Sequence, residues 1–487
     1  MAYIKHPDEI AFAGDYNLNN IDLYNHKGQV VDLKNIVIEL NIYESIYKNA
    51  VTGSIVVTDA NNFIGKMEIQ GLEKLAFKLE TPGVDNANSI DASMETGEPF
   101  HVYKITNRKQ INQNLTLYTL HFASREFMRN IRTKVSQAFE GSMHLAVMKI
   151  LLDDDYLDSK RDLFYEPTGN NDKLVIPNIS PFAAINMIAQ RTLSANTRGV
   201  GYYFYETTKG FHFRSWASMC SNKGKHKKST KQVFYSMPMK VDDPTIDDKK
   251  AHEYKSVESY SFLNNFHDVA ANTALGTYGH KVITHNLFDK SITEDNYNYH
   301  NQFGDTIHAD FDGNYGSDYI KYAVADALVD YDDKKNVSDY TESRVSLQSS
   351  TRFLHDDDVG SYGINAAEDS RKTGERVSQR NQVMHGTILK LVIKGQSYIQ
   401  AGDLIEFNVR PIETENKVVD LKDGRFAGNY VVTKIRHKVA NNEYKMILEC
   451  AKDSSFEPLS KGTTRWKTER IPSIVSLYGL DDRGGQE

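Results

Sequence analysis

Apolar and polar residues alternate along the first quarter of the chain, and this alternation predicts β-strands. Between Ile36 and Ile42 every second residue is Ile or Leu, which is typical of a strand with one buried face. Gly53–Thr58 predicts the returning strand, and Gly71–Thr81 predicts the next one. The preceding residues 1–30 are rich in asparagine and predict an extended N-terminal arm.

The pattern of the early strands returns near the C-terminus. Val102–Ile105 (VYKI) matches Val432–Ile435 (VTKI), and in both places a basic run, an asparagine-containing turn and a closing strand follow. A strand and a spacer precede each hairpin, beginning at Gly71 in one case and at Gly402 in the other. Any two hairpins resemble each other to some extent, but the matched order favours duplication of a small β-barrel or sandwich.

Between the two copies the period changes from two residues to that of a helix. Leu145, Met148 and Leu152 predict a helix that ends at Asp153–Asp155, and Ser180-Pro181 is typical of the start of a second helix. Residues 200–214 predict an aromatic hairpin with its turn at Thr207–Gly210. We therefore expect a compact α+β unit here.

The second copy is predicted to be split in the sequence. Glu253–Phe262 and Gly279–Asn286 resemble Ile36–Ile42 and Gly53–Thr58, whereas the rest of the copy begins only near Met384. The intervening stretch, rich in Tyr, Asp and Asn, predicts an insertion with one helical segment, Tyr319–Leu328. The expected domains are 1–30 (arm), 31–123 (first β-barrel), 124–250 (α+β domain), 251–290 with 381–458 (second β-barrel), 291–380 (insertion) and 459–487 (C-terminal tail).

Composition narrows the class of protein. A chain of 487 residues suggests roughly two to four domains. A net charge of −7 argues against binding nucleic acid through general phosphate neutralisation. The only two cysteines, Cys220 and Cys450, exclude a disulfide framework and indicate folding inside a cell. The N-terminus lacks the apolar core of a signal peptide, and no apolar run reaches the ~18 residues of a membrane span, so no stable membrane insertion is expected.

Candidate chemistry is sparse, and we predict no catalytic, cofactor-binding or metal-binding residues. The three carboxylates of Asp153–Asp155 oppose the dipole of the helix that they end, so we expect them to be solvated or paired. They could suggest a metal site, but consecutive helical positions point in different directions, which argues against it. The basic run Lys223–Lys231 predicts a solvated loop, with DNA contact left open. Histidines and other acidic stretches lack the spacing of zinc or EF-hand sites; they are His267, His280, His285, His300, His308, Asp310–Asn314, Asp330–Asp333 and His355–Asp358.

Two stretches carry a resemblance to a known family. Asn178–Arg191, which opens a helix with Ser-Pro-Phe, and the hairpin Gly201–Phe213 resemble the baseplate central hub protein of contractile-tailed bacteriophages and the related hub part of type VI secretion spike proteins. Gln400–Phe407 resembles a strand entry in the second tube domain of such hubs. The resemblance implies a mainly β, α+β chain with two tail-tube-like antiparallel β-barrels, the α+β domain between them and a long insertion in the second.

The same resemblance implies a structural virion protein of a contractile injection system. Three chains would form a homotrimer with a pseudo-sixfold ring that joins the tail tube protein to the central spike protein and lets DNA pass. Baseplate wedge proteins would surround this hub, which would be assembled in the host cytoplasm and reside in the tail baseplate. The alternative is a tail-associated cell-wall hydrolase with a carboxylate pair, but no sequence feature selects such a pair.

Ring formation requires covered strand edges and contacts between subunits. We expect interface residues on two strands that we take for edges, and in the C-terminal tail, whose apolar residues are too few to form their own core. The predicted interface residues are Gly53, Ile55, Val57, Val282, Ile283 and Trp466.

Overall fold

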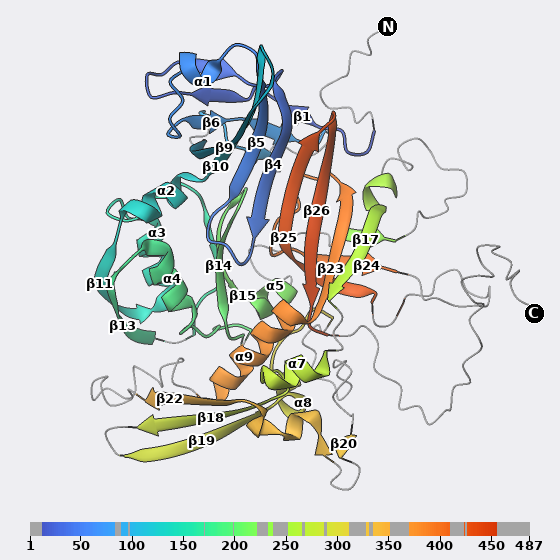
Figure 1. The fold of residues 1–487 in the computed structure, drawn as a ribbon. Helices are drawn as coiled ribbons and strands as arrows, with labels where there is room; N and C mark the ends of the chain where they lie inside the picture. The colour runs from blue at the N-terminus through green and yellow to red at the C-terminus, as the bar shows by residue number, and fades with distance from the viewer. Residues whose placement is uncertain are drawn as a thin grey trace, which may run out of the picture.

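The computed structural model is mainly β (Figure 1). It describes residues 12–82, 89–95, 98–169, 171–197, 199–221, 232–236, 252–264, 268–286, 290–310, 328–330, 335–350, 370–409, 423 and 426–454. The basic run 223–231, His267, the segment 355–358, most of the helix predicted at 319–328, and the tail with Trp466 lie outside these ranges. In the part of the chain that is described, no helix is long and apolar enough to span a membrane.

Thirteen of the described strands form one sheet, in which strands from both ends of the sequence lie side by side (Figure 1). Its spatial order is β17 (Val257–Asn264), β23 (Thr387–Lys394), β26 (Glu443–Lys452), β25 (Gly428–Ala440), β4 (Val37–Ser45), β5 (Thr52–Asp59), β10 (Leu115–Ala123), β9 (Phe100–Asn112), β6 (Lys74–Ala76), β2 (Asp22–Tyr24) and β3 (Val30–Asp32). Beside β25, β24 (Leu404–Asn408) and β16 (Gln232–Tyr235) complete it. A small sheet of β1 (Asn17–Leu18), β7 (Lys78–Glu80) and β8 (Ile90–Asp91), with the short α1 (Phe63–Lys66), flanks the first copy.

The predicted duplication is visible in this strand order. The first copy pairs in the order β4, β5, β10, β9, β6, and the second in the order β17, β23, β26, β25, β24. Both copies also follow the same chain order, so each strand of one copy has a counterpart in the other. The two copies are therefore equivalent in topology as well as in sequence pattern.

Two β-bulges occur at equivalent positions in both copies. Tyr103 is the extra residue between β9 and β10, and Thr433 is the extra residue between β25 and β26. Ile38 between β4 and β5 likewise corresponds to Glu258 between β17 and β23. Because a bulge bends its strand and increases the local twist, shared bulges give both copies the same curvature. They also fix the residue-by-residue correspondence, in which Ser261 is the counterpart of Asn41.

One continuous apolar core covers one face of the sheet. Leu40, Ile55 and Phe122 of the first copy belong to the same buried cluster as Leu391 and Leu448 of the second. The opposite face is polar, as period-2 alternation requires. Burial of each large aliphatic side chain contributes about 1.5–3 kcal/mol, so this shared core binds the two copies into one body.

Two expectations about the barrels are corrected. Within the described residues no ladder closes either copy into a barrel, because half of β25 pairs with β4 of the other copy. In the second copy a single β-bridge, between Tyr235 and Ser256, connects the two ends of the strand order. The counterpart of Gly53–Thr58 is β23, and the prediction of Gly279–Asn286 for this role was wrong. Gly279–Asn286 is instead β18, the central strand of a separate sheet.

The α+β unit between the copies has its own core. It contains α2 (Arg125–Arg132), β11 (Val135–Ser142), α3 (Met143–Leu152), β12 (Leu163–Tyr165), β13 (Asn171–Ile179), α4 (Pro181–Ala189), β14 (Tyr202–Thr207), β15 (Gly210–Ser215) and α5 (Trp216–Ser221). Its core is aromatic, with Phe204, Phe211 and Phe213 buried from the predicted hairpin. Leu145 and Leu152 of α3 are exposed, because Val147, Ile150 and Leu151 form the buried face of that helix instead.

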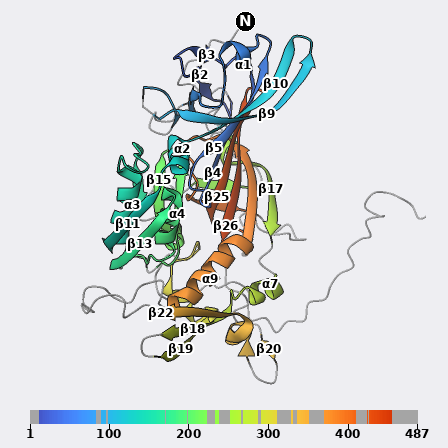
Figure 2. The same ribbon diagram turned by 60° about the vertical axis from the view of Figure 1, so that its left-hand side comes forward.

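The insertion forms a small sheet below the main one (Figure 1). Its described elements are α7 (Val269–Ala274), β18 (Gly279–Asn286), β19 (Ser291–Asn298), α8 (Tyr299–Gln302), the 3-10 turns Phe303–Asp305, Val337–Asp339 and Thr341–Ser343, the pair β20 (Leu328–Asp330) and β21 (Lys335–Asn336), β22 (Val345–Ser350) and α9 (Ser370–His385). The three-stranded sheet runs in the order β19, β18, β22. Helix α9 lies between this sheet and the main sheet, and it leads directly into β23 (Figure 2).

Candidate subunit interface

Strands β25 and β4 join the two copies within the chain. Residues 434–440 of β25 pair antiparallel with residues 39–45 of β4, placing Lys438 opposite Asn41 and Val439 opposite Leu40. On the polar face, Arg436 binds Glu39 at 3.0 Å and donates from Nε to Asn41 Oδ1 at 2.8 Å. On the apolar face, Leu40 and Ile42 are completely buried. This junction therefore has a complete ladder, a packed face and a paired charged face.

The bulge at Thr433 divides β25 into two halves with different partners. Residues 428–431 pair with β24, whereas residues 434–440 pair with β4 of the other copy. The equivalent strand β9 begins in the same way, since Phe100 and His101 pair with β6. Beyond its bulge at Tyr103, however, β9 has β10 as its only strand partner among the described residues.

A second open edge lies at the opposite end of the sheet. Strand β17 is the counterpart of β4, and it pairs only with β23 within the described chain. Tyr260 and Leu263 on this strand are 43% and 51% exposed. The upper half of β9 extends away from the sheet with its hairpin (Figure 2), and Ile111 there is 48% exposed. Unpaired strand edges with exposed apolar side chains are sites at which another chain can pair.

The two open edges match the two sides of the internal junction. If β9 of one chain met β17 of another as β25 meets β4, Lys109 would lie opposite Ser261 and Gln110 opposite Tyr260. This register follows from the pairing of β9 with β10: β9 has one further register shift, between Thr106 and Lys109, that β25 lacks. Lys109, which pairs with Leu117, is therefore the counterpart of Lys438, which pairs with Lys445. The same type of antiparallel strand pairing would then form both the junction within each chain and the junction between chains.

The polar face around the internal junction carries cations that are paired with carboxylates. Lys434 contacts Glu449, and Arg436 and Lys438 share Glu39 at 3.0 and 3.3 Å. At the edge of the second copy, Lys394 and Lys445 both bind Glu258 and Glu443, at distances from 2.6 to 3.2 Å. The face is consequently rich in charge but close to balanced.

The predicted interface residues on β5 and β18 do not lie on edge strands. Gly53, Ile55 and Val57 lie on β5, which pairs with β4 on one side and β10 on the other, so β5 is not an edge. Val282 and Ile283 lie on β18, the central strand of the insertion sheet; Val282 is buried and Ile283 is half-buried. Their contact with a neighbouring subunit stays a prediction that the edge argument no longer supports, and Trp466 lies outside the described residues.

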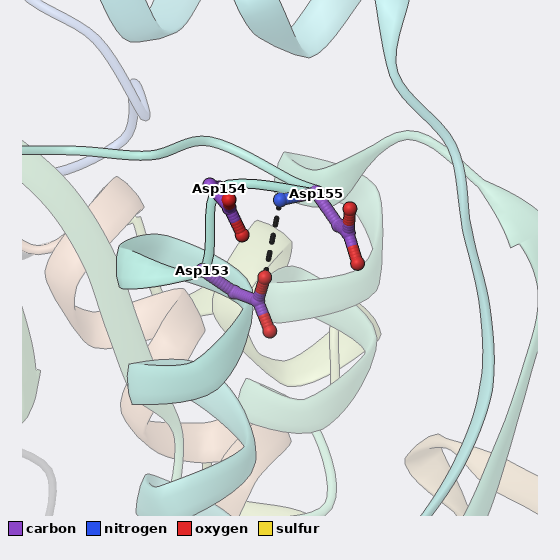
Figure 3. A group of neighbouring side chains, drawn as sticks. All are labelled: Asp153, Asp154 and Asp155. Atoms are coloured by element: carbon purple, nitrogen blue, oxygen red, sulfur yellow. Dashed lines mark hydrogen bonds between the residues drawn. The ribbon is translucent and has the colours of Figure 1, made fainter.

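The acidic triplet lies in a turn after α3 and not on consecutive positions of the helix. Helix α3 ends at Leu152, so Asp153, Asp154 and Asp155 follow it in a turn, with ligand oxygens within 4.8 Å of one another (Figure 3). Asp153 accepts a hydrogen bond from the backbone N–H of Asp155 at 3.1 Å. The other two carboxylates are exposed, and the expectation that the triplet holds no metal ion stays a prediction.

The histidines are distributed among structural contacts. His280 is buried beside the Ser346 hydroxyl at 2.7 Å, and burial lowers the pKa of its imidazole to about 4. His308 lies between Asp453 and the carbonyl of Phe303 at 2.9 and 2.7 Å. Apart from the acidic triplet, no group of three potential ligands comes together within the described ranges.

Sequence reasoning missed a buried charged cluster between the first copy and the α+β unit. Arg161 lies 3.5 Å from both Glu98 and Glu206, and Glu126 is buried close by, where it accepts a hydrogen bond from Ser159. Burial, opposed by Arg161 and reinforced by Glu126, raises the pKa of Glu206 to about 8. Its other oxygen accepts the Val51 N–H at 2.8 Å. These residues are far apart in sequence, so no local pattern could reveal the cluster.

This cluster predicts that stability falls as pH rises from about 4.5 to about 8. The folded state binds the Glu206 proton more tightly than the unfolded state, whose carboxyl has its ordinary pKa of 4.5. Glu206→Gln retains an acceptor for Val51 and removes the titration. We expect the variant to have a melting temperature roughly 2–4 °C above wild type at pH 8.5, with a smaller difference at pH 5. Exposed Glu140→Gln is the control, and a gain of the same size at both pH values would contradict the assignment.

Comparisons with known proteins were made for the whole chain. No family model and no curated protein matches the sequence. Among solved structures, the chain is similar to the prophage MuSo2 43 kDa tail protein from Shewanella oneidensis, with a TM-score of 0.46, 9% identity, and coverage of 90% of this chain and 100% of that one. A tail protein from Neisseria meningitidis gives a TM-score of 0.46, 9% identity, and 90% and 97% coverage. The E. coli c3393 protein, a component of the type VI secretion system, gives 0.39, 8% identity, and 87% and 76% coverage. The matched structures are thus phage tail and type VI secretion proteins, the classes that the sequence motifs resemble.

Proposed function

We propose that this chain is the subunit of a homotrimeric tail hub in which six copies of the duplicated sheet unit form a ring. The observation that supports the proposal best is the β25–β4 junction together with the open edges of β9 and β17. Each chain contributes one internal junction. Each chain also offers the two strand edges needed for one junction with each neighbour.

Three chains close such a ring with six junctions. Three junctions lie within chains, between β25 and β4, and three lie between chains, between β9 and β17. Closed rotational symmetry satisfies every edge, whereas a monomer leaves two edges unpaired. A dimer would have to close with four copies, whereas the resemblance to hub proteins supports six.

The polar face is proposed to line the lumen of this ring. Its cations near the internal junction are bound to carboxylates, so they would neutralise few phosphates of DNA in transit. Such a lining would let DNA pass without holding it. On this proposal the ring connects the tail tube to the central spike in the virion baseplate, with wedge proteins around it, and its role is structural, not enzymatic.

Light scattering tests the proposed stoichiometry. The purified chain, alone or with its spike partner, should have three times the mass of one chain. Binding of short duplex DNA should be weak at 0.15 M salt, because the cations near the internal junction are already paired with carboxylates. A stable monomer at high concentration with the spike present would contradict the ring.

A further inference from the structure

The insertion sheet has two faces of different character. One face packs toward α9, with Val282 buried and Gln348 accepting a hydrogen bond from Thr373 at 3.2 Å. On the other, which we call the outer face, Ile292, Val345 and Leu347 are 65%, 52% and 76% exposed. The strand register brings Leu347 beside the half-buried Ile283 of β18.

The outer face is an unusual surface for a chain in water. Single exposed aliphatic residues are common, but here those of the two outer strands, β19 and β22, lie on one face, with the half-buried Ile283 of the central strand between them. Charged residues border them: Lys281 binds Glu294 at 3.6 Å and Glu342 at 2.9 Å, and the Glu342 side chain is 80% exposed. Two glutamates share one lysine at this border, so an apolar centre with a net acidic border fits an apolar segment that carries basic residues.

The chain leaves the second copy beside this insertion. After β26, Asp453 accepts a hydrogen bond from the Ala309 N–H at 2.9 Å, and Ser454 accepts one from the Asp310 N–H at 3.0 Å. Residues 455–487 follow. The 17 residues from Ser454 to Ile471 can reach up to roughly 56–61 Å when extended, and they start in contact with the insertion at Asp310.

The C-terminal tail contains a segment of matching chemistry. Residues 471–478 read IPSIVSLY and include Ile471, Ile474, Val475 and Leu477, and the basic Lys467 and Arg470 come just before them. We propose that this segment, 471–478, covers the outer face of the insertion sheet, with the basic residues toward Glu294 and Glu342. The insertion then serves as a docking platform for the tail. The proposal does not depend on ring formation.

Hydrogen exchange of the full chain tests the contact. Leu347→Asp places a charge at the most exposed position of the outer face and should leave the fold intact. We expect amides of residues 471–478 to exchange at least ten-fold faster than in wild type. Val175→Asp is the matched control, since Val175 is 69% exposed on a strand of the α+β unit, and it should leave the tail unchanged. Equal exchange in wild type and Leu347→Asp would overturn the proposal.

Cross-linking identifies the occupant directly. With Leu347→Cys and Ser476→Cys in one chain, a short bismaleimide should join positions 347 and 476, and Val175→Cys with Ser476→Cys should give at least ten-fold less product. A product of monomer mass places the tail on its own chain, and a larger one places it on a neighbour; both support the contact. A bond from position 347 to position 347 of a second copy, with none to position 476, would show another occupant and overturn it.

Discussion

Ser261→Lys should convert the proposed trimer into monomers. In the proposed register, Ser261 of β17 lies opposite Lys109 of β9 in the neighbouring chain, so the substitution places two ammonium groups directly across from each other. Like charges in opposed cross-strand positions cost about 0.2–1 kcal/mol each, and three such junctions act together in one ring. We expect the midpoint of assembly to move to at least ten-fold higher protein concentration, measured by sedimentation. Ser261 lies at an exposed sheet edge, so the monomer should retain its melting temperature.

A second substitution distinguishes this contact from general damage. Lys109→Glu in the same chain as Ser261→Lys creates an opposite-charge pair at each junction between chains and should restore the trimer. Leu145→Lys, on the exposed side of α3, is the control and should assemble as wild type does. A double variant that stays monomeric while the control forms trimers would show that these residues are not opposed.

Gly53→Ala should be among the most damaging single-methyl additions in the chain. A Cβ at this position would lie 2.1 Å from Phe122 Cζ and 2.5 Å from the carbonyl oxygen of Asn41. Both neighbours belong to strands that pair with β5, so neither can move without disturbing the sheet. Overpacking of this kind costs about 1–3 kcal/mol, and we expect a clear loss of the melting temperature in calorimetry.

The second copy indicates how the site can be relieved. There, the counterparts of Gly53 and Phe122 are Leu389 and Cys450. The large residue of this pair is therefore on β10 in the first copy and on β23 in the second. Phe122→Leu should therefore recover part of the stability of Gly53→Ala. If the double variant were less stable than the sum of both single changes, the close contact with Phe122 would not be the cause.

The duplication could be predicted from sequence because its most similar residues lie at a structural constraint. The motifs VYKI and VTKI contain Tyr103 and Thr433, the extra residues of matching bulges. Bulges bend a strand at a defined position, and the residues around them are held by that geometry. The hairpin at 200–214 and the helix after Ser180 were also visible, since each depends on neighbouring residues only.

The strand with which a given strand pairs could not be predicted from its sequence. Gly279–Asn286 has the apolar pattern of Gly53–Thr58, yet it pairs with β19 and β22, and the true counterpart β23 follows more than one hundred residues later. Local pattern predicts that a strand forms, but packing decides which edge it joins. The same holds for α3: Leu145 and Leu152, whose spacing indicated a helix, are exposed, and other residues form its buried face.

The candidate interface lay beyond sequence reasoning for a similar reason. An open edge is defined by the absence of a pairing strand, and the change of partner of β25 at Thr433 is set by the tertiary fold, not by a local pattern. The cluster around Arg161 also joins residues from Glu98 to Glu206 that share no local motif. Long-range charge networks of this kind are set by the tertiary fold.

Disulfide trapping tests the central claim most directly. Lys109→Cys with Ser261→Cys in one chain should give covalently linked trimers under mild oxidation, visible on a non-reducing gel and lost on reduction. Lys438→Cys with Asn41→Cys, the equivalent pair inside the chain, should form its bond within single chains. Lys109→Cys with Phe262→Cys, one residue out of register, should link poorly. Covalent trimers from the first pair are the predicted result, and no linkage between chains while the internal pair forms readily would contradict the proposed ring.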